Sequence, residues 1–363
     1  WSVVVPTSTG TAIVGRDGGV TELPATFREV RSGPGARLTM SLPELVDLDG
    51  DGMHELLESR TGAKGRIKCT PRRADGGYGE PVVWDTGPLY QGARPRPGAR
   101  SGSEEEHTAL VLWDTGDMDG DGTLEVAVGT RRMEDPGLGE ALDAIRGKAA
   151  IDLAFHALSW DGTVSGSPER RLEMRGHPMY VRSARGGPSP FVDLDRDGRP
   201  ELLTVRIRIG VFGVARTMAS GEASPNVELS GYRLLRGKWK RVSSNMPEVR
   251  YRVDLGSGEL SQYARVPGDV TGDGTWDLVE IDSRTVRVYP GKVGSGPLFS
   301  NEPATERSLQ APIRSWQGAV FVDLEGEGRL DLIAFEPVDG KEDEGMAEPV
   351  RIELVRLDEG EKP

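Results

Sequence analysis

The sequence predicts an all-β protein assembled from several small antiparallel sheets, and three observations predict it. Glycine (49) and proline (25) punctuate a chain of 363 residues of which 36% are hydrophobic, which is typical of many short segments joined by turns. Five related acidic stretches recur along the chain, and an apolar run follows each of them. Short runs rich in Val, Ile, Tyr and Trp lie between them, as expected for strands. The length allows two or three domains or one large β domain, and the repeat favours a single domain over residues 1–363.

The five acidic stretches share one skeleton. An acid stands at loop positions 1, 5 and 9, an acid or Thr at position 3, and Gly at position 6. The stretches are VDLDGDGMHELLE (46–58), GDMDGDGTLEVAVG (116–129), VDLDRDGRPELLTV (192–205), GDVTGDGTWDLVEID (268–282) and VDLEGEGRLDLIAFE (322–336).

This spacing predicts calcium-binding loops. Calcium takes about six to eight oxygen ligands, and acids at alternate positions of a tight loop can all face one centre. The predicted side-chain ligands are, loop by loop, Asp47, Asp49, Asp51 and Glu55; Asp117, Asp119, Asp121 and Glu125; Asp193, Asp195, Asp197 and Glu201; Asp269, Thr271, Asp273 and Asp277; Asp323, Glu325, Glu327 and Asp331. Backbone carbonyls at position 7 would add Met53, Thr123, Arg199, Thr275 and Arg329. We therefore expect up to five Ca²⁺ ions, with a hydroxyl at one ligand position of the fourth loop and two longer glutamates in the fifth.

The charge of the chain agrees with bound cations. The formal net charge is -13 and the sequence pI ≈ 5.0, which argues against nucleic acid or anionic lipid as the main partner, because both select basic surfaces. The loop carboxylates would repel one another at close range without a cation. Five Ca²⁺ ions would bring the net charge from -13 to about -3, so the loops account for most of the acidity.

The loops do not fit the EF-hand, although the first one matches its pattern as far as Glu58 at position 12. An EF-hand needs a bidentate acid at position 12, whereas the second, third and fifth loops have Val128, Thr204 and Ala334 there. The flanking segments also alternate like strands and not like helices. The sequence therefore places the loops in strand-to-strand turns.

The loops recur at intervals that suit propeller blades. Their first acids lie at 47, 117, 193, 269 and 323, giving separations of 70, 76, 76 and 54 residues, and a four-stranded blade takes about 40 to 50 residues before insertions. The pattern resembles the FG-GAP or VCBS repeats of integrin α-subunit heads and many bacterial surface proteins, over roughly residues 37–336, and the acidic loop alone carries the match. The resemblance implies a β-propeller in which each loop joins the first two strands of a blade and holds one calcium ion.

Closure of such a ring needs strands from both ends of the chain. Candidate strands SVVVP, TAIVGR and GGVTELP precede the first loop, and RLDLIAFEPV and PVRIELVRLD follow the last. We expect about six blades, with five or seven as alternatives, and ring closure by residues 1–36 and 329–358. Three segments interrupt this pattern: the polar loop 91–106, a short helix at 134–148, and an exposed loop at 214–227. These segments are either recognition loops or tolerated insertions.

The sequence nominates no catalytic constellation. His54, His107, His156 and His177 are scattered, and Cys69 is the only cysteine, so a buried apolar role suits it better than a reactive one. Most Trp residues stand in strand candidates, where core packing is the expected role. We expect a non-enzymatic binding, adhesion or scaffold module for a protein or glycan partner, within a surface assembly. The alternative is a propeller-based enzyme that acts on polysaccharides, a lyase or a hydrolase.

The expected location is extracytoplasmic: secreted, periplasmic or held at the cell surface. Weak calcium sites of the extracellular type fill only near millimolar calcium. The sequence opens at Trp1, from which we expect that a signal or lipid-anchor segment has been removed. No apolar stretch approaches the ~20 residues of a membrane-spanning helix.

Overall fold

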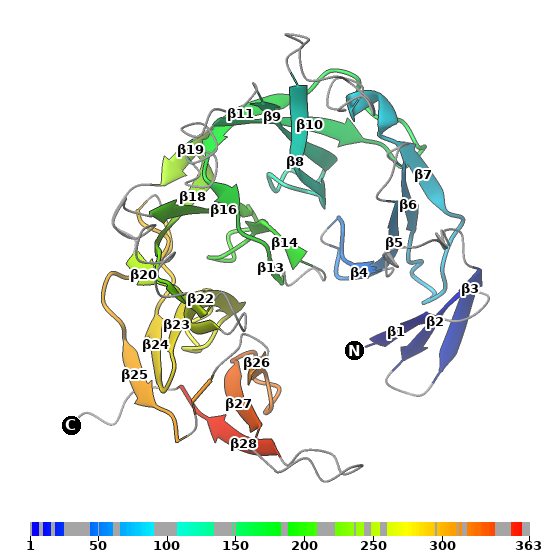
Figure 1. Ribbon diagram of the computed structural model, residues 1–363. Coiled ribbons are helices and arrows are strands. Elements are labelled where there is room, and N and C mark those ends of the chain that lie inside the picture. Colours follow the sequence, from blue (N-terminus) through cyan, green and yellow to red (C-terminus); the bar gives the residue numbers. More distant parts are fainter. Residues whose placement is uncertain are drawn as a thin grey trace, which may run out of the picture. The chain divides into compact units, whose positions relative to one another are not determined.

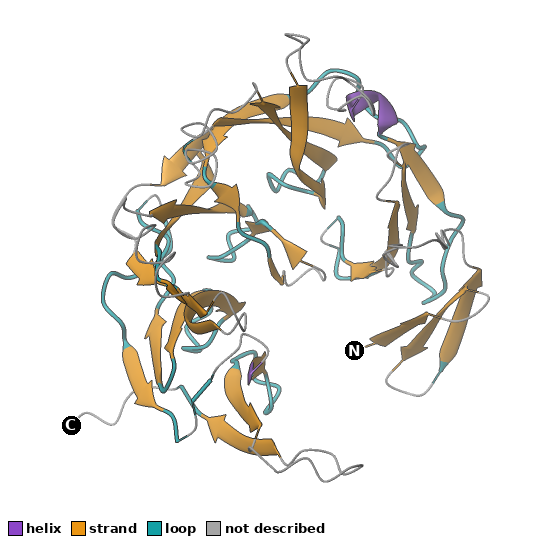
Figure 2. Cartoon of the chain, viewed as in Figure 1, coloured by secondary structure: helices purple, strands orange, loops and turns teal. Residues whose placement is uncertain are grey.

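The computed structural model describes most of the chain as antiparallel β-structure. The described residues are 2–6, 10–15, 19–24, 44–49, 51–60, 66–90, 107–133, 148, 150–182, 188–208, 222–235, 237–242, 248–254, 260–294, 296–310, 312–313, 318–337 and 350–357. Within them the regular secondary structure is strand, joined by turns and loops, apart from short 3-10 turns such as η1 (Gly87–Tyr90), as Figures 1 and 2 show. The predicted all-β class is confirmed.

The chain divides into two compact units. The first comprises Trp1–Asp135, Ile151–Met174 and Ser183–Pro188, and the second comprises Pro136–Ala150, Arg175–Arg182 and Ser189–Pro363. The loops at 47–55 and 117–125 belong to the first unit, and the other three belong to the second.

The first unit contains three sheets of neighbouring antiparallel strands, in the order of the chain. The N-terminal sheet is β1 (Ser2–Pro6), β2 (Gly10–Gly15) and β3 (Val20–Pro24). The second sheet is β4 (Glu44–Val46), β5 (Glu55–Arg60), β6 (Arg66–Thr70) and β7 (Val82–Asp85). The third is β8 (His107–Gly116), β9 (Leu124–Met133), β10 (Ala150–Leu158) and β11 (Arg170–Arg175). The last two are four-stranded meanders of the size expected for a blade.

The second unit contains three larger sheets, besides the short pair β13 (Val181–Arg182) and β14 (Pro188–Ser189). The first of them runs β12 (His177–Pro178), β16 (Glu201–Arg208), β18 (Asn226–Leu235) and β19 (Lys238–Val242), with β15 (Phe191–Val192) paired to β16 and β20 (Glu248–Arg250) paired to β18. The next runs β17 (Glu222–Ala223), β21 (Arg252–Asp254), β22 (Leu260–Gly268), β23 (Asp277–Asp282), β24 (Thr285–Tyr289) and β25 (Thr305–Ser308). The last is β26 (Ala319–Val322), β27 (Asp331–Pro337) and β28 (Val350–Val355).

Every acidic loop joins two antiparallel strands, as the sequence predicts. The connected pairs are β4–β5, β8–β9, β15–β16, β22–β23 and β26–β27. In the sheets of the first, second and fifth loops these are the first two strands, whereas β21 and β17 precede the pair in the sheet of the fourth loop. The strand flanks rule out an EF-hand, because that motif needs helices on both sides of its loop.

Successive sheets within a unit share hydrophobic cores. In the first unit, Leu48 and Ile67 of one sheet pack with Val126 and Leu158 of the next, around Trp84. The indole Nε1 of Trp84 donates a 2.7 Å hydrogen bond to the carbonyl oxygen of Ser159. The predicted packing role is confirmed for Trp84. Burying such apolar faces stabilises the unit by about 25 cal/mol per Å².

The same arrangement recurs twice in the second unit. One core joins the strands around Leu203 to those around Leu278, and a second joins Val279 and Ile281 to Leu332. Cys69 in the first unit is fully buried, and burial raises the pKa of its thiol well above the ordinary range. The predicted inert, apolar role of this cysteine therefore agrees with its surroundings.

Several expectations fall wholly or partly outside the described residues. The loop at 91–106 lies outside them, and so does the helix at 134–148 except for Lys148. The prediction of an exposed loop at 214–227 is wrong for its last residues. Ala223 of β17 pairs with Val253, and β18 begins at Asn226. Among the described strands, β1 pairs with β2 and β28 with β27, so closure of a ring by the two ends of the chain stays a prediction.

Candidate metal-binding loops

The glycine at position 6 takes a left-handed backbone conformation in all five loops. The φ angles of Gly52, Gly122, Gly198, Gly274 and Gly328 lie between 84° and 93°. A Cβ atom at Gly122 would meet nothing within 4 Å, so the requirement for glycine comes from the backbone angle and not from lack of space. The turn predicted from the sequence is therefore present in each loop.

The acid at position 1 closes every loop in the same way. One of its carboxylate oxygens accepts a hydrogen bond from the backbone N–H of the position 6 glycine. The pairs are Gly52 to Asp47 (3.1 Å), Gly122 to Asp117 (3.1 Å), Gly198 to Asp193 (3.0 Å), Gly274 to Asp269 (2.9 Å) and Gly328 to Asp323 (2.7 Å). In the second to fifth loops the other oxygen, Oδ1, also accepts backbone hydrogen bonds from within the loop, so the position 1 acid organises the turn with both of its oxygens.

The acid at position 5 binds the backbone of its own turn. Its Oδ1 atom accepts a hydrogen bond from the N–H of the position 7 residue in four loops, as in an Asx turn. The pairs are Met53 to Asp51 (2.7 Å), Thr123 to Asp121 (2.8 Å), Arg199 to Asp197 (2.9 Å) and Thr275 to Asp273 (2.8 Å).

The acid at position 9 lies at the first or second residue of a strand and is buried. It accepts a hydrogen bond from the N–H of the position 2 residue in four loops: Leu48 to Glu55 (2.9 Å), Met118 to Glu125 (2.9 Å), Leu194 to Glu201 (2.9 Å) and Val270 to Asp277 (2.7 Å). Glu55, Glu125 and Glu201 are each 2% exposed. A carboxylate at such a depth needs a partner for its second oxygen, because an unpaired buried charge is costly.

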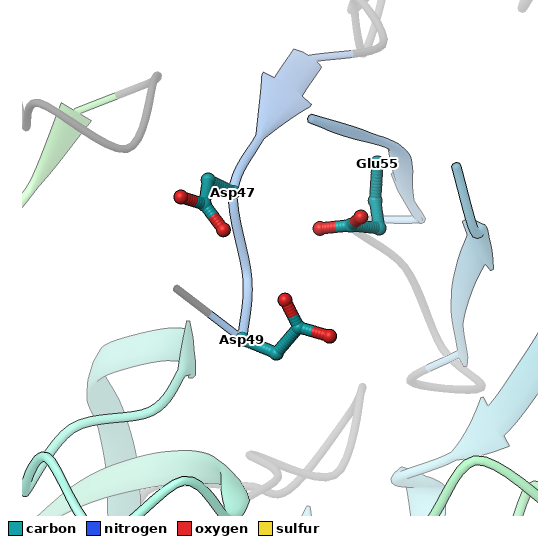
Figure 3. Close-up of side chains that lie close together, drawn as sticks. All are labelled: Asp47, Asp49 and Glu55. Atoms are coloured by element: carbon teal, nitrogen blue, oxygen red, sulfur yellow. The ribbon is translucent and has the colours of Figure 1, made fainter. Parts of the chain in front are cut away.

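Carboxylates converge in the first three loops. In the first loop, ligand oxygens of Asp47, Asp49 and Glu55 lie within 4.8 Å of one another, and Figure 3 shows the three side chains turned toward one another. The second loop brings together the same positions, 1, 3 and 9, as Asp117, Asp119 and Glu125. The third loop instead brings together positions 1, 3 and 5, as Asp193, Asp195 and Asp197. These clusters could hold a metal ion.

The second loop has the deepest cluster. All three of its acids are buried, and Oε1 of Glu125 has no hydrogen-bond partner. Burial raises the pKa of Glu125 to about 8, although the N–H of Met118 acts in the opposite direction. Arg170, whose side chain is 31% exposed, contacts Asp119 and approaches Asp121. A cation placed among the three acids would give the unpartnered oxygen its missing contact.

The first loop is a shallower version of the second. Burial raises the pKa of Glu55 to about 7, and burial also raises the pKa of Asp49. Asp47 and Asp49 are half-buried, whereas Asp51 is exposed. The oxygens of this site belong to hard carboxylate ligands, which suit calcium or magnesium better than a soft metal.

The third loop places a guanidinium beside its position 9 acid. Nε of Arg233 lies 2.8 Å from Oε1 of Glu201. Burial raises the pKa of Glu201 to about 8, and the charge of Arg233 offsets part of this rise. The loop therefore already contains a positive charge.

The fourth loop uses its carboxylates internally. The Oδ2 atom of Asp277 accepts hydrogen bonds from the N–H groups of Val270 (2.7 Å) and Thr271 (2.8 Å), and its Oδ1 accepts one from Gly291 (3.0 Å). Gly291 must be glycine, because a Cβ atom there would lie 2.3 Å from the carbonyl oxygen of Trp276. With both oxygens satisfied by the backbone, Asp277 has less need of a metal than Glu125 does.

The fifth loop is mostly exposed. Asp323 accepts hydrogen bonds from the N–H groups of Gly326, Glu327 and Gly328, and the bond from Gly328 is the main reason that its pKa lies below the ordinary value. Glu325 forms an ion pair with Arg356. Within the described residues, the fourth and fifth loops form no group of three converging acids like those of the first three. The ligand sets predicted there are thus not brought together.

Backbone hydrogen bonds hold neighbouring loops side by side, which the sequence did not indicate. In the first unit, the N–H of Asp117 donates to the carbonyl oxygen of Leu48 (3.2 Å). In the second unit, Trp276 donates to Leu194 (2.8 Å) and Leu330 donates to Asp269 (2.8 Å). The loops of each unit therefore lie next to one another.

Comparisons with known proteins add little. No family model matches the sequence, and no curated protein matches it. The solved structures with some likeness include the exotype rhamnogalacturonan lyase YesX (14% identity, TM-score 0.28, 91% of this chain and 55% of that chain) and the rhamnogalacturonan lyase YesW (14% identity, TM-score 0.27, 91% and 57%). The chain thus spans little more than half the length of either lyase. At these TM-scores the likeness assigns neither a fold nor a function to this chain. In the described part of the chain, no helix has the length and apolar character needed to cross a membrane.

Proposed function

We propose that this chain is a calcium-binding β-propeller module of the FG-GAP type that acts outside the cytoplasm as a binding or scaffold unit for a protein or glycan. The observation that carries the calcium proposal is the buried Oε1 of Glu125, which has no partner and belongs to a cluster with Asp117 and Asp119. A divalent cation among these oxygens would convert mutual repulsion into attraction in a site shielded from water.

Calcium suits these loops better than other divalent ions. The three acids of the cluster offer oxygen ligands only, and the carbonyl of Thr123 at position 7 is a further candidate ligand. Magnesium demands near-ideal octahedral geometry and keeps several of its waters, whereas calcium accepts irregular sets of carboxylates and carbonyls. The extracytoplasmic part of the proposal assumes that these loops bind calcium as extracellular modules do, with a Kd of about 10⁻⁴ to 10⁻³ M, so that they fill only where calcium is near millimolar.

The meander sheets support the propeller part of the proposal. Four-stranded sheets with an acidic loop between their first two strands, packed on one another through shared cores, are the units from which propellers are built. No observation among the described residues favours the alternative of a polysaccharide-acting enzyme. His156 is buried, and its Nδ1 lies 2.9 Å from the carbonyl oxygen of Ser165, as in a structural histidine.

Calorimetric titration tests the calcium proposal. Protein freed of metal by a chelating resin is expected to bind calcium at the first two loops with a Kd of about 1 mM or lower, and to bind magnesium more weakly. The variant Asp117→Asn should lose one of these calcium ions, because it removes a carboxylate from the second cluster. Absence of heat and of retained calcium in equilibrium dialysis up to several millimolar would refute the proposal.

A further inference from the structure

The third loop differs from the second in what faces its position 9 acid. In both loops, Oε2 of the glutamate accepts a 2.9 Å hydrogen bond from the position 2 N–H. In the second loop, Oε1 of Glu125 has no hydrogen-bond partner. In the third loop, Oε1 of Glu201 lies 2.8 Å from Nε of Arg233, as an ion pair whose geometry is not that of a hydrogen bond. The oxygen that would contact a cation in one loop thus contacts a guanidinium in the other.

Arg233 is built into the third loop. It lies on β18, one residue beyond the pair Leu202–Tyr232, so the antiparallel register places it opposite Glu201. Its side chain is 5% exposed, and Nη2 also lies 3.3 Å from Oδ2 of Asp195 and donates a 2.9 Å hydrogen bond to the carbonyl oxygen of Lys292. The guanidinium therefore bridges the acids at positions 3 and 9.

In the first two loops, the acids at positions 3 and 9 both belong to the cluster of converging carboxylates. There they converge with position 1, whereas in the third loop Glu201 is absent from the converging group. A calcium ion that used Asp195 and Glu201 would lie within a few ångströms of the guanidinium. Like charges at that distance repel strongly in a buried site.

The residue opposite the position 9 acid separates the loops into two kinds. Register pairs Ala157 with Glu125, and extension of the neighbouring registers by one residue places Pro71 opposite Glu55 and Pro290 opposite Asp277. The same extension places Arg356 opposite Asp331 in the fifth loop. Arg356 forms an ion pair with Glu325 at position 3, as Arg233 does with Asp195. In both sheets that have an arginine opposite the position 9 acid, this arginine contacts the position 3 acid.

We propose that Arg233 is a built-in counter-ion that takes the place of calcium in the third loop. This inference rests on the proposed function, because it assumes that the first two loops bind calcium. The third loop then stays folded in the absence of calcium. The calcium response of the protein comes from the loops whose position 9 acid contacts no arginine: in the second loop, Arg170 contacts Asp119 but leaves Oε1 of Glu125 without a partner. Arg356 does not have this role in the fifth loop, because its ion pair is with Glu325 and the buried Oδ1 of Asp331 has no hydrogen-bond partner.

Calcium stoichiometry of charge-removing variants tests this role. Arg233→Met is expected to bind one calcium ion more than the wild type in calorimetry, because Asp195 and Glu201 become free to coordinate it. Without calcium this variant should melt below the wild type, and calcium should restore most of the loss. Arg233→Lys keeps a positive charge and should bind the wild-type number of ions. Arg241→Met is the matched control, since it removes an arginine that pairs with Glu228 on the same sheet at 3.3 Å, outside the loop.

Three outcomes would overturn the inference. The first is an Arg233→Met protein that binds no additional calcium. The second is an Arg233→Met protein that is unfolded at every calcium concentration while Arg233→Lys is native. The third is an Asp193→Asn protein, with Arg233 intact, that binds one ion fewer than the wild type. Failure of the proposed function has a different signature, because the wild type itself would then bind no calcium; a gain of one ion in Arg233→Met would still support the role of Arg233.

Discussion

Removal of calcium is expected to lower the melting midpoint of this protein by on the order of 10 °C. An ion that binds only the folded state stabilises it by about 2.7 kcal/mol when its free concentration is one hundred times the Kd. The two loops of the first unit would together contribute about 5 kcal/mol on that basis. In a unit of 150 to 250 residues, each kcal/mol moves the midpoint by about 2 to 4 °C. Differential scanning calorimetry measures this loss when it compares the metal-free protein with protein at a free calcium concentration of one hundred times the Kd.

The size of this loss should depend on pH, which gives an internal control. Burial raises the pKa of Glu55 to about 7 and that of Glu125 to about 8 in the metal-free protein, against an ordinary value of 4.5. The folded state therefore holds protons that the unfolded chain has released, so the metal-free protein loses stability as pH rises from about 4.5 to about 8. Calcium needs the ionised carboxylates. The effect of calcium should thus be small at pH 5 and large at pH 8.

The metal for this experiment is best removed with a chelating resin, because soluble chelators also lose affinity in acid. Magnesium at the same concentration should restore less of the midpoint than calcium does. Coincident melting curves at pH 8, with and without calcium, would contradict the account.

Replacement of Glu125 by Gln should change stability in opposite directions in the two metal states. Without calcium at pH 8, the variant should melt above the wild type, because a neutral amide replaces a buried carboxylate that has an unpartnered oxygen. With calcium it should melt below the wild type, because the second loop loses a charged ligand and with it up to about 2.7 kcal/mol of linked stability. Melting curves in both states show whether the order of the two proteins reverses.

Glu80→Gln is the matched control for this variant. Glu80 is exposed in the same unit, so the same chemical change there should leave both midpoints nearly unchanged. A Glu125→Gln protein that melts below the wild type by the same amount in both metal states would mean that Glu125 supports packing alone.

The sequence predicted the all-β class and the strand-to-strand placement of the loops because both follow from local patterns. Alternating apolar residues mark strands such as β10, and a glycine at position 6 marks a turn that only a left-handed backbone can make. Strands with a weak apolar pattern gave little signal. In β25, for example, only Thr305 is buried, so nothing in TERS distinguishes an edge strand from a loop.

The sequence set the fourth and fifth loops apart by Thr271 and by the two longer glutamates, but it could not separate the third loop from the first two, because the partners of the loop acids are distant in the chain. The third loop has a complete set of acids, yet Arg233 reaches it from a strand more than thirty residues away. The fourth loop lacks only one carboxylate, but the N–H of Gly291 already satisfies one oxygen of Asp277. Strand register and backbone donors decide what each carboxylate contacts, and neither is visible in the spacing of the acids.

Anomalous diffraction from crystals grown with calcium tests the central claim most directly, because it locates each ion. The account predicts a strong calcium peak among Asp117, Asp119 and Glu125, a second among Asp47, Asp49 and Glu55, and a guanidinium with no peak beside Glu201. A second loop that contains only water at several millimolar calcium would contradict it.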